Sequence, residues 1–223
     1  MLTQLILNRF FISQNLPEFQ SLQVHTTISF LLSFKKYTFL DPNTAHARLV
    51  LSDDGMEVKD RGEDKEVNDA LERFDLFGSV LAVNCLASGK SYWEVEVSNK
   101  TGWDLGVVRG DANRKGNLSL NPENGYWVTV HYDSEKYAAL TSQPVLLSLS
   151  TKPKKVGVFV DYEEGLVSFY DATAQSHIYS FTECLFSGEI FPYFSPHTKQ
   201  DEKNAEPLII SAVKPCQKDM DMS

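Results

Sequence analysis

The sequence is poor in cysteine and contains no long apolar run. Its three cysteines, Cys85, Cys184 and Cys216, are scattered over 223 residues without a Cys-x-x-Cys pair. This usage argues against a disulfide framework and against a structural zinc site, and a reducing compartment is its simplest setting. No apolar stretch approaches the ~18 residues that a membrane-spanning helix needs. We therefore expect a cytoplasmic protein that does not enter a membrane.

Sequence signatures of catalysis are also missing. There is no G-x-S-x-G, H-E-x-x-H, Walker or G-x-G-x-x-G motif. Residues 88–91 (SGKS) resemble the end of a phosphate-binding loop, but the upstream glycine is absent and an expected strand follows in place of a helix. The five histidines are far apart, without a carboxylate or a second histidine at ligand spacing. We expect no enzymatic activity, no cofactor and no metal site.

Positive charge is in deficit. The 21 basic and 30 acidic residues give a net charge of −9, which disfavours nucleic acids and anionic membranes as partners. Residues 53–75 hold ten acidic and four basic side chains, a local net charge of −6. Such a stretch is either a solvated loop or an acidic rim that attracts a basic partner. The sequence leaves both interpretations open.

The first 36 residues follow neither a period of 2 nor a period of 3.6, and Pro17 interrupts them. We interpret residues 1–36 as an irregular N-terminal extension. Their start, MLTQLILNRFFI, lacks the positive first region and the small-residue cleavage site of a secretory signal.

From residue 40 onward, short strands alternate with turns. The clearest pattern is YWEVEV at 92–97, whose alternation predicts a half-buried strand. Further strands are expected at 48–51, 56–59, 103–109, 126–132, 156–161, 166–170, 177–181, 191–194 and 208–213. This spacing predicts an all-β protein of two antiparallel sheets packed face to face. Only residues 42–47 and 68–73 favour short helices.

The three tryptophans, Trp93, Trp103 and Trp127, fall within expected strands. We assign them to the core because each aromatic side chain can bury ~150–250 Å². If Trp127 points inward, alternation places Val130 and Tyr132 on the opposite face of that strand. Tyr132 ends the strand at a loop, where an amphipathic ring serves binding or packing equally well.

Six motifs carry a family resemblance, in the order in which the family has them. They are LDPNTA with LVLS (40–45 and 49–52), YWEVEV (92–97), WDLGV (103–107), NGYW (124–127), VGVFVDY (156–162) and FPYFSP (191–196). The first resembles the PRY segment and the others resemble the SPRY segment. The chain thus resembles the C-terminal PRY-SPRY module of tripartite-motif E3 ubiquitin ligases and of butyrophilins. The resemblance is strongest to the tripartite-motif type of fish.

This resemblance divides the chain into three parts. The PRY-SPRY domain is expected at 37–215, with PRY at about 37–88 and SPRY at about 89–213. It follows the extension (1–36) and precedes a C-terminal tail (216–223). The resemblance implies a bent β-sandwich of the concanavalin-like jelly-roll type, with short helices near the start of PRY, that binds proteins through loops at one end.

The expected binding surface combines loops 110–117, 132–136 and 196–204 with part of 53–68. We predict that its ligand-binding residues are Gly110, Asp111, Arg114, Val130, Tyr132, Phe194 and His197. In the antibody-binding member of the tripartite-motif group, large aromatic residues follow the G-[FY]-W motif. Here Val130 stands at one of those positions, and Gly110 stands where that member has an acidic residue, so antibody binding is not expected.

The resemblance implies that the chain recognises a protein ligand, either to select substrates for a tripartite-motif-type ubiquitin ligase or to act as an innate immune sensor. The alternative is a butyrophilin-like domain that senses a phosphometabolite. This needs a basic pocket, for which the acidic chain shows no cluster, although Arg109, Arg114 and Lys115 lie near one another. The sequence carries no RING pattern and no heptads. We therefore expect ubiquitination only if an upstream tripartite motif is attached.

Overall fold

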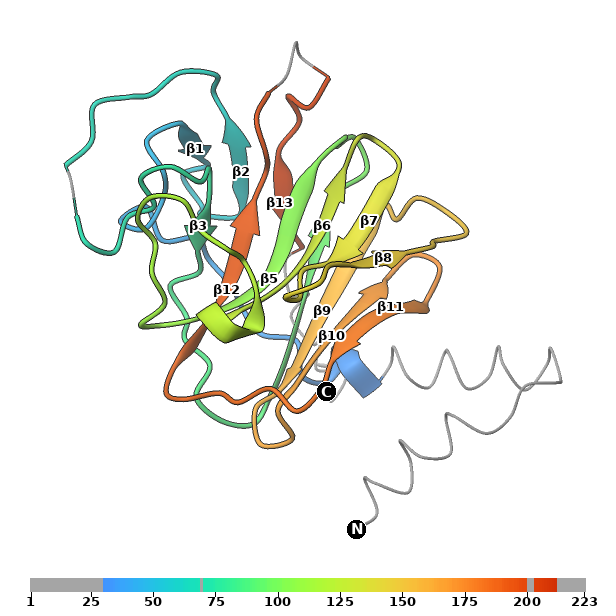
Figure 1. Cartoon of the computed structure of the whole chain (residues 1–223). Helices are drawn as coiled ribbons and strands as arrows, with labels where there is room; N and C mark the ends of the chain where they lie inside the picture. Colours follow the sequence, from blue (N-terminus) through green and yellow to red (C-terminus); the bar gives the residue numbers. More distant parts are fainter. Residues whose placement is uncertain (1–29, 69, 200–202, 212–223) are drawn as a thin grey trace, which may run out of the picture.

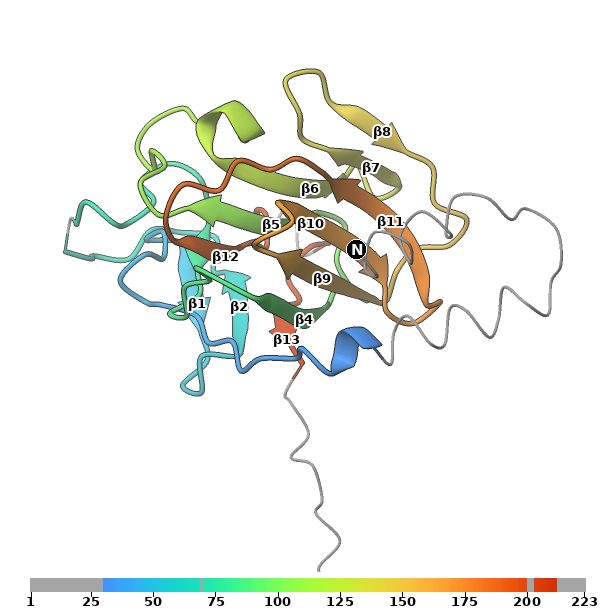
Figure 2. The same ribbon diagram turned by 90° about the horizontal axis from the view of Figure 1, so that it is seen from below.

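The computed structural model describes residues 30–68, 70–199 and 203–211. Nearly all regular structure in these ranges is β-strand (Figure 1). The strands form two antiparallel sheets, one of seven strands and one of six, that pack face to face (Figure 2). The all-β, two-sheet architecture predicted from the sequence is confirmed.

The seven-stranded sheet has the order β1-β2-β13-β4-β9-β10-β11. Its strands are β1 (Leu49–Leu51), β2 (Glu57–Asp60), β13 (Leu208–Ile210), β4 (Lys90–Glu96), β9 (Lys155–Asp161), β10 (Leu166–Asp171) and β11 (Ser176–Phe181). The PRY strands β1 and β2 therefore join the SPRY strands through β13, which comes from the other end of the domain.

The six-stranded sheet has the order β3-β12-β5-β6-β7-β8. Its strands are β3 (Val80–Leu81), β12 (Ile190–Ser195), β5 (Trp103–Arg109), β6 (Tyr126–Tyr132), β7 (Lys136–Ala139) and β8 (Val145–Leu147). The bounds of β5 and β6 agree with the predicted ones. Strands β3, β7 and β8 were not predicted, because they are short and lack a run of alternating residues.

The space between the sheets is filled by the inward faces of their strands. Trp93 of β4, Trp103 of β5 and Trp127 of β6 are each at most 3% exposed and belong to one apolar cluster. Valines of β9 meet them from the seven-stranded sheet. The assignment of the tryptophans to the core is confirmed.

A second apolar layer covers the outer face of the six-stranded sheet. Tyr126 and Tyr193 project from β6 and β12, and the ring of Phe74 packs on Tyr193 with centroids 5.8 Å apart. The hydroxyl groups of Tyr193 and Ser79 lie 2.6 Å apart. These contacts bring the loop around residues 74–79 onto the SPRY sheet, where it forms one wall of the candidate site.

The segment 30–36 lies against the outer face of the seven-stranded sheet, beside β4 (blue in Figure 2). Leu31 is buried with Tyr92 and Phe159. The Lys35 ammonium lies 3.0 Å from the Glu94 carboxylate in a mostly buried ion pair. The last residues of the predicted extension therefore contact the sheet, whereas residues 1–29 lie outside the described part of the chain.

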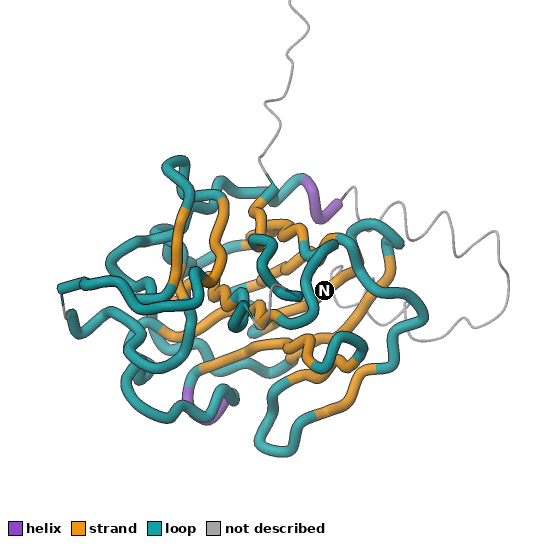
Figure 3. Tube along the Cα trace, turned by 90° about the horizontal axis from the view of Figure 1, so that it is seen from above, coloured by secondary structure: helices purple, strands orange, loops and turns teal. Residues whose placement is uncertain are grey.

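The two short helices predicted from the sequence do not form. Residues 42–47 make turns, in which the Asp41 carboxylate accepts from the Asn43 N–H and the Thr44 hydroxyl donates to the Asp41 carbonyl. Such local side-chain bonds compete with a helix. The described residues of 68–73 also form turns. Helical turns occur instead at 30–32 and at the 3-10 helix η1 (Pro122–Asn124), and loops make up most of the rest (Figure 3).

Gly106 tests the close approach of β5 and β6. A Cβ at this position would lie 2.1 Å from the Trp127 carbonyl oxygen and 2.8 Å from the Val128 Cα, and backbone atoms cannot move aside cheaply. We expect Gly106→Ala to lower the free energy of unfolding by about 2–3 kcal/mol, measured by urea denaturation. Gly78→Ala, where nothing lies within 4 Å of the added atom, is the matched control. Equal stability of the two variants would contradict the proposed packing.

Candidate functional site

A pocket of about 570 Å³ opens at the end of the sandwich where β5 begins and β6 and β12 end. We call it the Asp104 pocket. Its walls come from several separate segments, and the residues that line it are His46, Arg48, Asp60, Leu76, Phe77, Gly78, Thr101, Gly102, Asp104, Asn117, Tyr132, Asp133, Ser134, Ser195, His197, Thr198 and Asn204. PRY and SPRY residues therefore contribute to one cavity.

Strand alternation explains why β5 and β6 point polar groups into this pocket. Trp103 turns inward, so its neighbour Asp104 turns outward. Trp127 likewise turns inward, which places Val130 and Tyr132 on the outer face, and Asp104 pairs with Val130 in the ladder. Tyr132 is half-buried and lines the pocket, and Val130 lies one pair further along the same face.

Asp104 and His197 form the central ion pair of the pocket. The His197 Nε2–H donates to the Asp104 Oδ1 at 2.7 Å, with the side chains 29% and 9% exposed. Burial alone lowers the pKa of His197, but the neighbouring Asp104 carboxylate outweighs burial, so the pKa is raised above its ordinary value. His197 also has a φ of 56°, a left-handed conformation that non-glycine residues adopt rarely.

Asn204 ties the pocket loops together. Its side-chain oxygen accepts from the backbone N–H groups of Thr101 (2.9 Å) and Gly102 (3.3 Å). Its amide nitrogen donates to the carbonyl oxygens of Gly102 (3.2 Å), Pro196 (2.7 Å) and Thr198 (3.2 Å). One buried side chain thus holds the β4–β5 turn and the loop after β12 in a fixed relation.

Lys100 also stabilises the loop that contains Asn204. Its ammonium is fully buried and donates to the carbonyl oxygens of Asn204 (3.1 Å) and Glu206 (2.9 Å). Burial lowers the pKa of Lys100 to about 8, and the charges of Asp60 and Glu206 limit this fall. The ammonium acts as a structural donor and does not line the pocket.

On the PRY side, Arg48 lies 2.9 Å from the buried carboxylate of Asp60. The backbone N–H of Arg48 donates to the Nδ1 of His46, and the Nε2 of His46 lies 3.1 Å from the Asp75 carbonyl oxygen. Since Nδ1 accepts a hydrogen bond, the proton is assigned to Nε2, which donates to that carbonyl. These contacts hold the PRY wall of the pocket.

The structure brings only some of the predicted ligand-binding residues together. Tyr132 and His197 line the Asp104 pocket, and Val130 lies beside it. Gly110, Asp111 and Arg114 belong to the neighbouring loop, which reaches the pocket only through Asn117.

The prediction that Phe194 binds the ligand is wrong. Its side chain is fully buried and packs in the core between the sheets, so it cannot contact a ligand. The preceding residue, Tyr193, is fully buried on the opposite face of β12, because the layer around Phe74 covers that face. Neither Tyr193 nor Phe194 is therefore a surface anchor.

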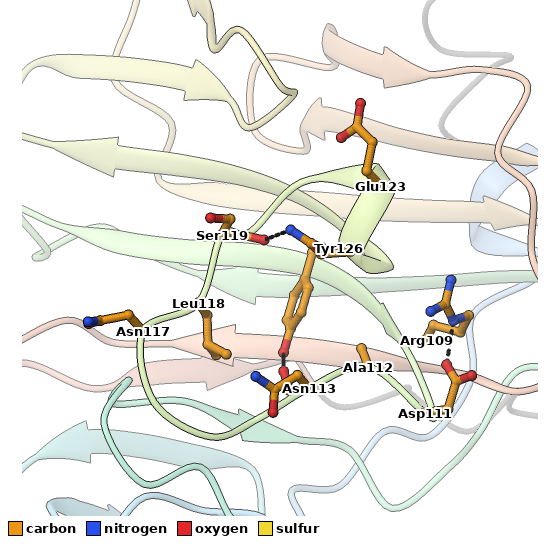
Figure 4. Close-up of a pocket in the computed structure, with 10 residues that line it drawn as sticks. Arg109, Asp111, Ala112, Asn113, Asn117, Leu118, Ser119, Glu123 and Tyr126 are labelled. Atoms are coloured by element: carbon orange, nitrogen blue, oxygen red, sulfur yellow. Dashed lines mark hydrogen bonds and ion pairs between the residues drawn. The ribbon is translucent and has the colours of Figure 1, made fainter.

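A second, smaller pocket of about 310 Å³ lies beside the loop 111–119 (Figure 4). Arg109 is ion-paired with Asp111 there, and the Tyr126 hydroxyl donates to the Asn113 carbonyl oxygen. Arg114 instead donates to the carbonyl oxygens of Glu72 and Gly110. The arginines that a phosphometabolite would need are therefore already bonded to groups of this chain, Arg109 to a carboxylate and Arg114 to backbone carbonyls.

Sequence reasoning missed most of the pocket residues. Asp104 could have been found, because the alternation that turns Trp103 and Leu105 inward places it on the outer face, opposite Val130. His46 could not, since its hydrogen bond reaches a residue 29 positions away. Asn204 lies at the end of the predicted loop 196–204, but its contacts with residues about 100 positions away could not be predicted. No periodic pattern encodes such contacts.

Comparison with known families decides what kind of domain this is. The family model described as SPRY domain matches residues 90–208, and the one described as SPRY-associated domain (PRY) matches residues 39–86. The chain belongs to the SPRY domain family. The family resemblance noted from the six motifs is thereby confirmed, and the domain is a protein-interaction module.

Several curated proteins share this PRY-SPRY region. Pyrin from Homo sapiens is 42% identical over 199 residues, which cover 89% of this chain and 24% of pyrin. The E3 ubiquitin-protein ligase TRIM21 from Mus musculus is 43% identical over 176 residues, covering 78% of this chain and 37% of that protein. The chain thus spans about a quarter to two fifths of the length of these relatives.

Solved structures share its fold. Stonustoxin superposes with a TM-score of 0.71 at 25% identity, over 82% of this chain and 30% of the toxin chain. The PSpry domain of TRIM65 superposes with a TM-score of 0.67 at 19% identity, over 90% of this chain and 97% of that domain. The TRIM65 match concerns the fold alone.

Replacing Asp104 tests the ion pair of this SPRY domain. In Asp104→Asn, burial acts on His197 without the compensating carboxylate, so we expect its pKa to fall below the wild-type value in an NMR titration of the histidine ring protons. The raised pKa also stabilises the wild-type fold fully below the unfolded-state value of about 6.5, and this stabilisation is lost as pH rises through the folded-state value. An unchanged His197 titration in the variant would refute this role of Asp104.

Gly102 tests whether the imidazole needs its present position. A Cβ on Gly102 would lie 2.5 Å from the His197 Nδ1, so we expect Gly102→Ala to push the ring away from Asp104. The pKa of His197 should then fall as it does in Asp104→Asn, while the far-UV circular dichroism stays that of the wild type. A His197 titration identical to that of the wild type would show that the ring has another way to reach Asp104.

Proposed function

We propose that this SPRY domain recognises a protein ligand through the Asp104 pocket and the loops around it. The observation that carries the proposal is the cavity itself, since several segments far apart in sequence form one concave surface that contains the Asp104–His197 ion pair. Hydrogen bonds of Asn204 hold its loops in place, which reduces the entropy that binding must remove. A pre-formed concave surface of this kind suits a protruding segment of another protein.

The proposed role is target selection. When attached to an upstream tripartite motif, the domain would choose the substrate of a ubiquitin ligase, and when attached to other modules it would serve an innate immune sensor. The similarity to the E3 ubiquitin-protein ligase TRIM21 and to pyrin supports these two settings. The domain itself would carry out no reaction, and nucleic acids and membranes are not its partners.

We propose a cytoplasmic location for this activity. Cys85 is exposed and Cys184 is buried, and both are free thiols. An exposed free thiol persists most readily in a reducing compartment.

Tyr132 provides the test of the pocket as the docking site. Half-buried aromatic side chains at a pocket edge contribute strongly to binding, so Tyr132→Ala should weaken capture of the protein ligand about fivefold or more, equivalent to ~1 kcal/mol. The measurement is quantitative mass spectrometry of proteins retained from cell lysate by the immobilised chain. The melting temperature should change little.

Tyr37→Ala is the matched control, because Tyr37 is 56% exposed and lies outside the pocket lining. Proteins retained equally by the wild type and by both variants would place the docking site elsewhere on the domain.

A further inference from the structure

We infer that the Asp104 pocket receives a lysine or arginine side chain from a partner segment whose neighbouring residues are also basic. This inference deepens the proposed function and rests on it, since it names the chemistry of the ligand that the pocket selects.

The charges that line the pocket are mostly negative. Asp60, Asp104 and Asp133 contribute three carboxylates, and the lining contains a single arginine, Arg48, which is held by Asp60. The carboxylate of Asp104 is balanced only by His197, whose charge depends on pH. The carboxylate of Asp133 is 64% exposed and faces water.

Exposed carboxylates continue this charge along the PRY loop between β2 and β3, with Glu63, Asp64, Glu66 and Glu72 all exposed. Glu63 forms an exposed ion pair with Arg61 at 3.5 Å, whereas Arg73 and Arg114 do not pair with these carboxylates. Arg73 donates to the carbonyl oxygens of Pro42, Ala45 and Asn68, and Arg114 donates to those of Glu72 and Gly110. The loop therefore presents an acidic rim, which attracts a basic segment over a distance of about one Debye length, ~8–10 Å.

A lysine of this chain already shows how a cation binds at the pocket edge. The Lys136 Nζ lies 2.9 Å from the Asp133 Oδ2 and 5.7 Å from the centre of the Tyr132 ring. An aromatic face and a carboxylate thus share one ammonium group. Both charged side chains are more than 60% exposed, so this pair exchanges readily for a similar one from a partner.

The apolar part of the pocket fits the stem of such a side chain. Leu76 is 56% exposed, and Phe77 and Tyr132 are half-buried beside it. Lysine and arginine bury their methylene stems on apolar surface while the charged end reaches a carboxylate. Leu76 and Tyr132 would contact the stem, and Asp104 or Asp133 would take the charge.

His197 gives this binding mode a pH signature. Protonated His197 competes with an incoming cation for Asp104, whereas neutral His197 leaves the carboxylate available. The other ionisable groups near its ring are Lys100, from the β4–β5 turn, and His131 of β6. Lys100 is held by backbone carbonyls, and burial lowers the pKa of His131, so that ring becomes protonated only at a lower pH than usual. The affinity for a basic segment should therefore rise with pH through the titration of His197.

The test uses random peptides displayed on phage and selected on the immobilised full chain. We expect lysine and arginine to be enriched over the unselected library, and a lysine-to-glutamine change in a selected peptide to weaken binding about fivefold or more in fluorescence anisotropy. Asp104→Asn and Asp133→Asn should each weaken the same peptide at least about threefold. Asp133, being exposed, serves where Asp104→Asn fails to fold.

Two controls separate the pocket from the overall charge. Glu164→Gln removes one carboxylate from the β9–β10 turn at the opposite end of the sandwich and should change binding less than about twofold. In the wild type, binding should strengthen about threefold or more between about pH 6 and about pH 8, and this dependence should vanish in His197→Gln.

Each outcome has a distinct meaning. Peptides that lose affinity in Tyr132→Ala but are neutral or acidic would overturn the inference and leave the proposed function standing. Basic peptides that respond equally to Glu164→Gln and Asp133→Asn would also overturn it, because they would bind through net charge alone. Selected peptides that are indifferent to Tyr132→Ala, or the absence of any enriched peptide, would count against the proposed function as well.

Discussion

The structure depends on the alternation of side chains along two neighbouring strands. In β5 and β6, every second residue turns into the space between the sheets, where Trp103 and Trp127 lie. The residues between them must then face the opposite side, and there the chain places Asp104, Val130 and Tyr132. The register of these two strands thus determines both which residues pack in the core and which residues form the binding surface. A slip of one residue would exchange them, burying a carboxylate and exposing a tryptophan.

Alternation places the side chains, but polar contacts hold the loops. Strand ladders position part of the Asp104 pocket, as where Ser195 pairs with Asp104. The loops around it are held by side chains, and Asn204 joins two of them with hydrogen bonds to five backbone groups. A buried amide that satisfies both donors and acceptors in this way gives specificity of conformation, because any other loop arrangement would leave buried polar groups without partners. The scaffold therefore tolerates variable loop tips while the bases of the loops stay fixed.

The β-sandwich could be read from the sequence because its signals are local. Strong alternation and tryptophan positions located β4, β5 and β6 with little error, and the family motifs supplied the order of the elements. Strands of two to four residues, such as β3 and β7, carry too few residues to show a period. The helix expected at 42–47 failed because Asp41 and Thr44 form their own turn contacts.

The site was less predictable for a physical reason. The sequence can show that a residue lies on a loop at the binding end of the sandwich, which is how Tyr132 and His197 were found. Whether an aromatic side chain there is exposed depends on what covers it, and Phe194 and Tyr193 show that both faces of β12 are covered. Asn204 and His46 act through partners remote in sequence, so only the folded chain shows their role.

The burial of Lys100 has a further chemical consequence. Its amine is enclosed by the carbonyls of Asn204 and Glu206, so acylating reagents and modifying enzymes cannot reach the nitrogen while the loop is closed. Opening of that loop would expose an amine whose pKa lies near 8 in the closed state. Acylation of this one lysine would then trap the open conformation, since an amide in place of the ammonium would not fit the closed site. The acylation rate would report how often this end of the domain opens.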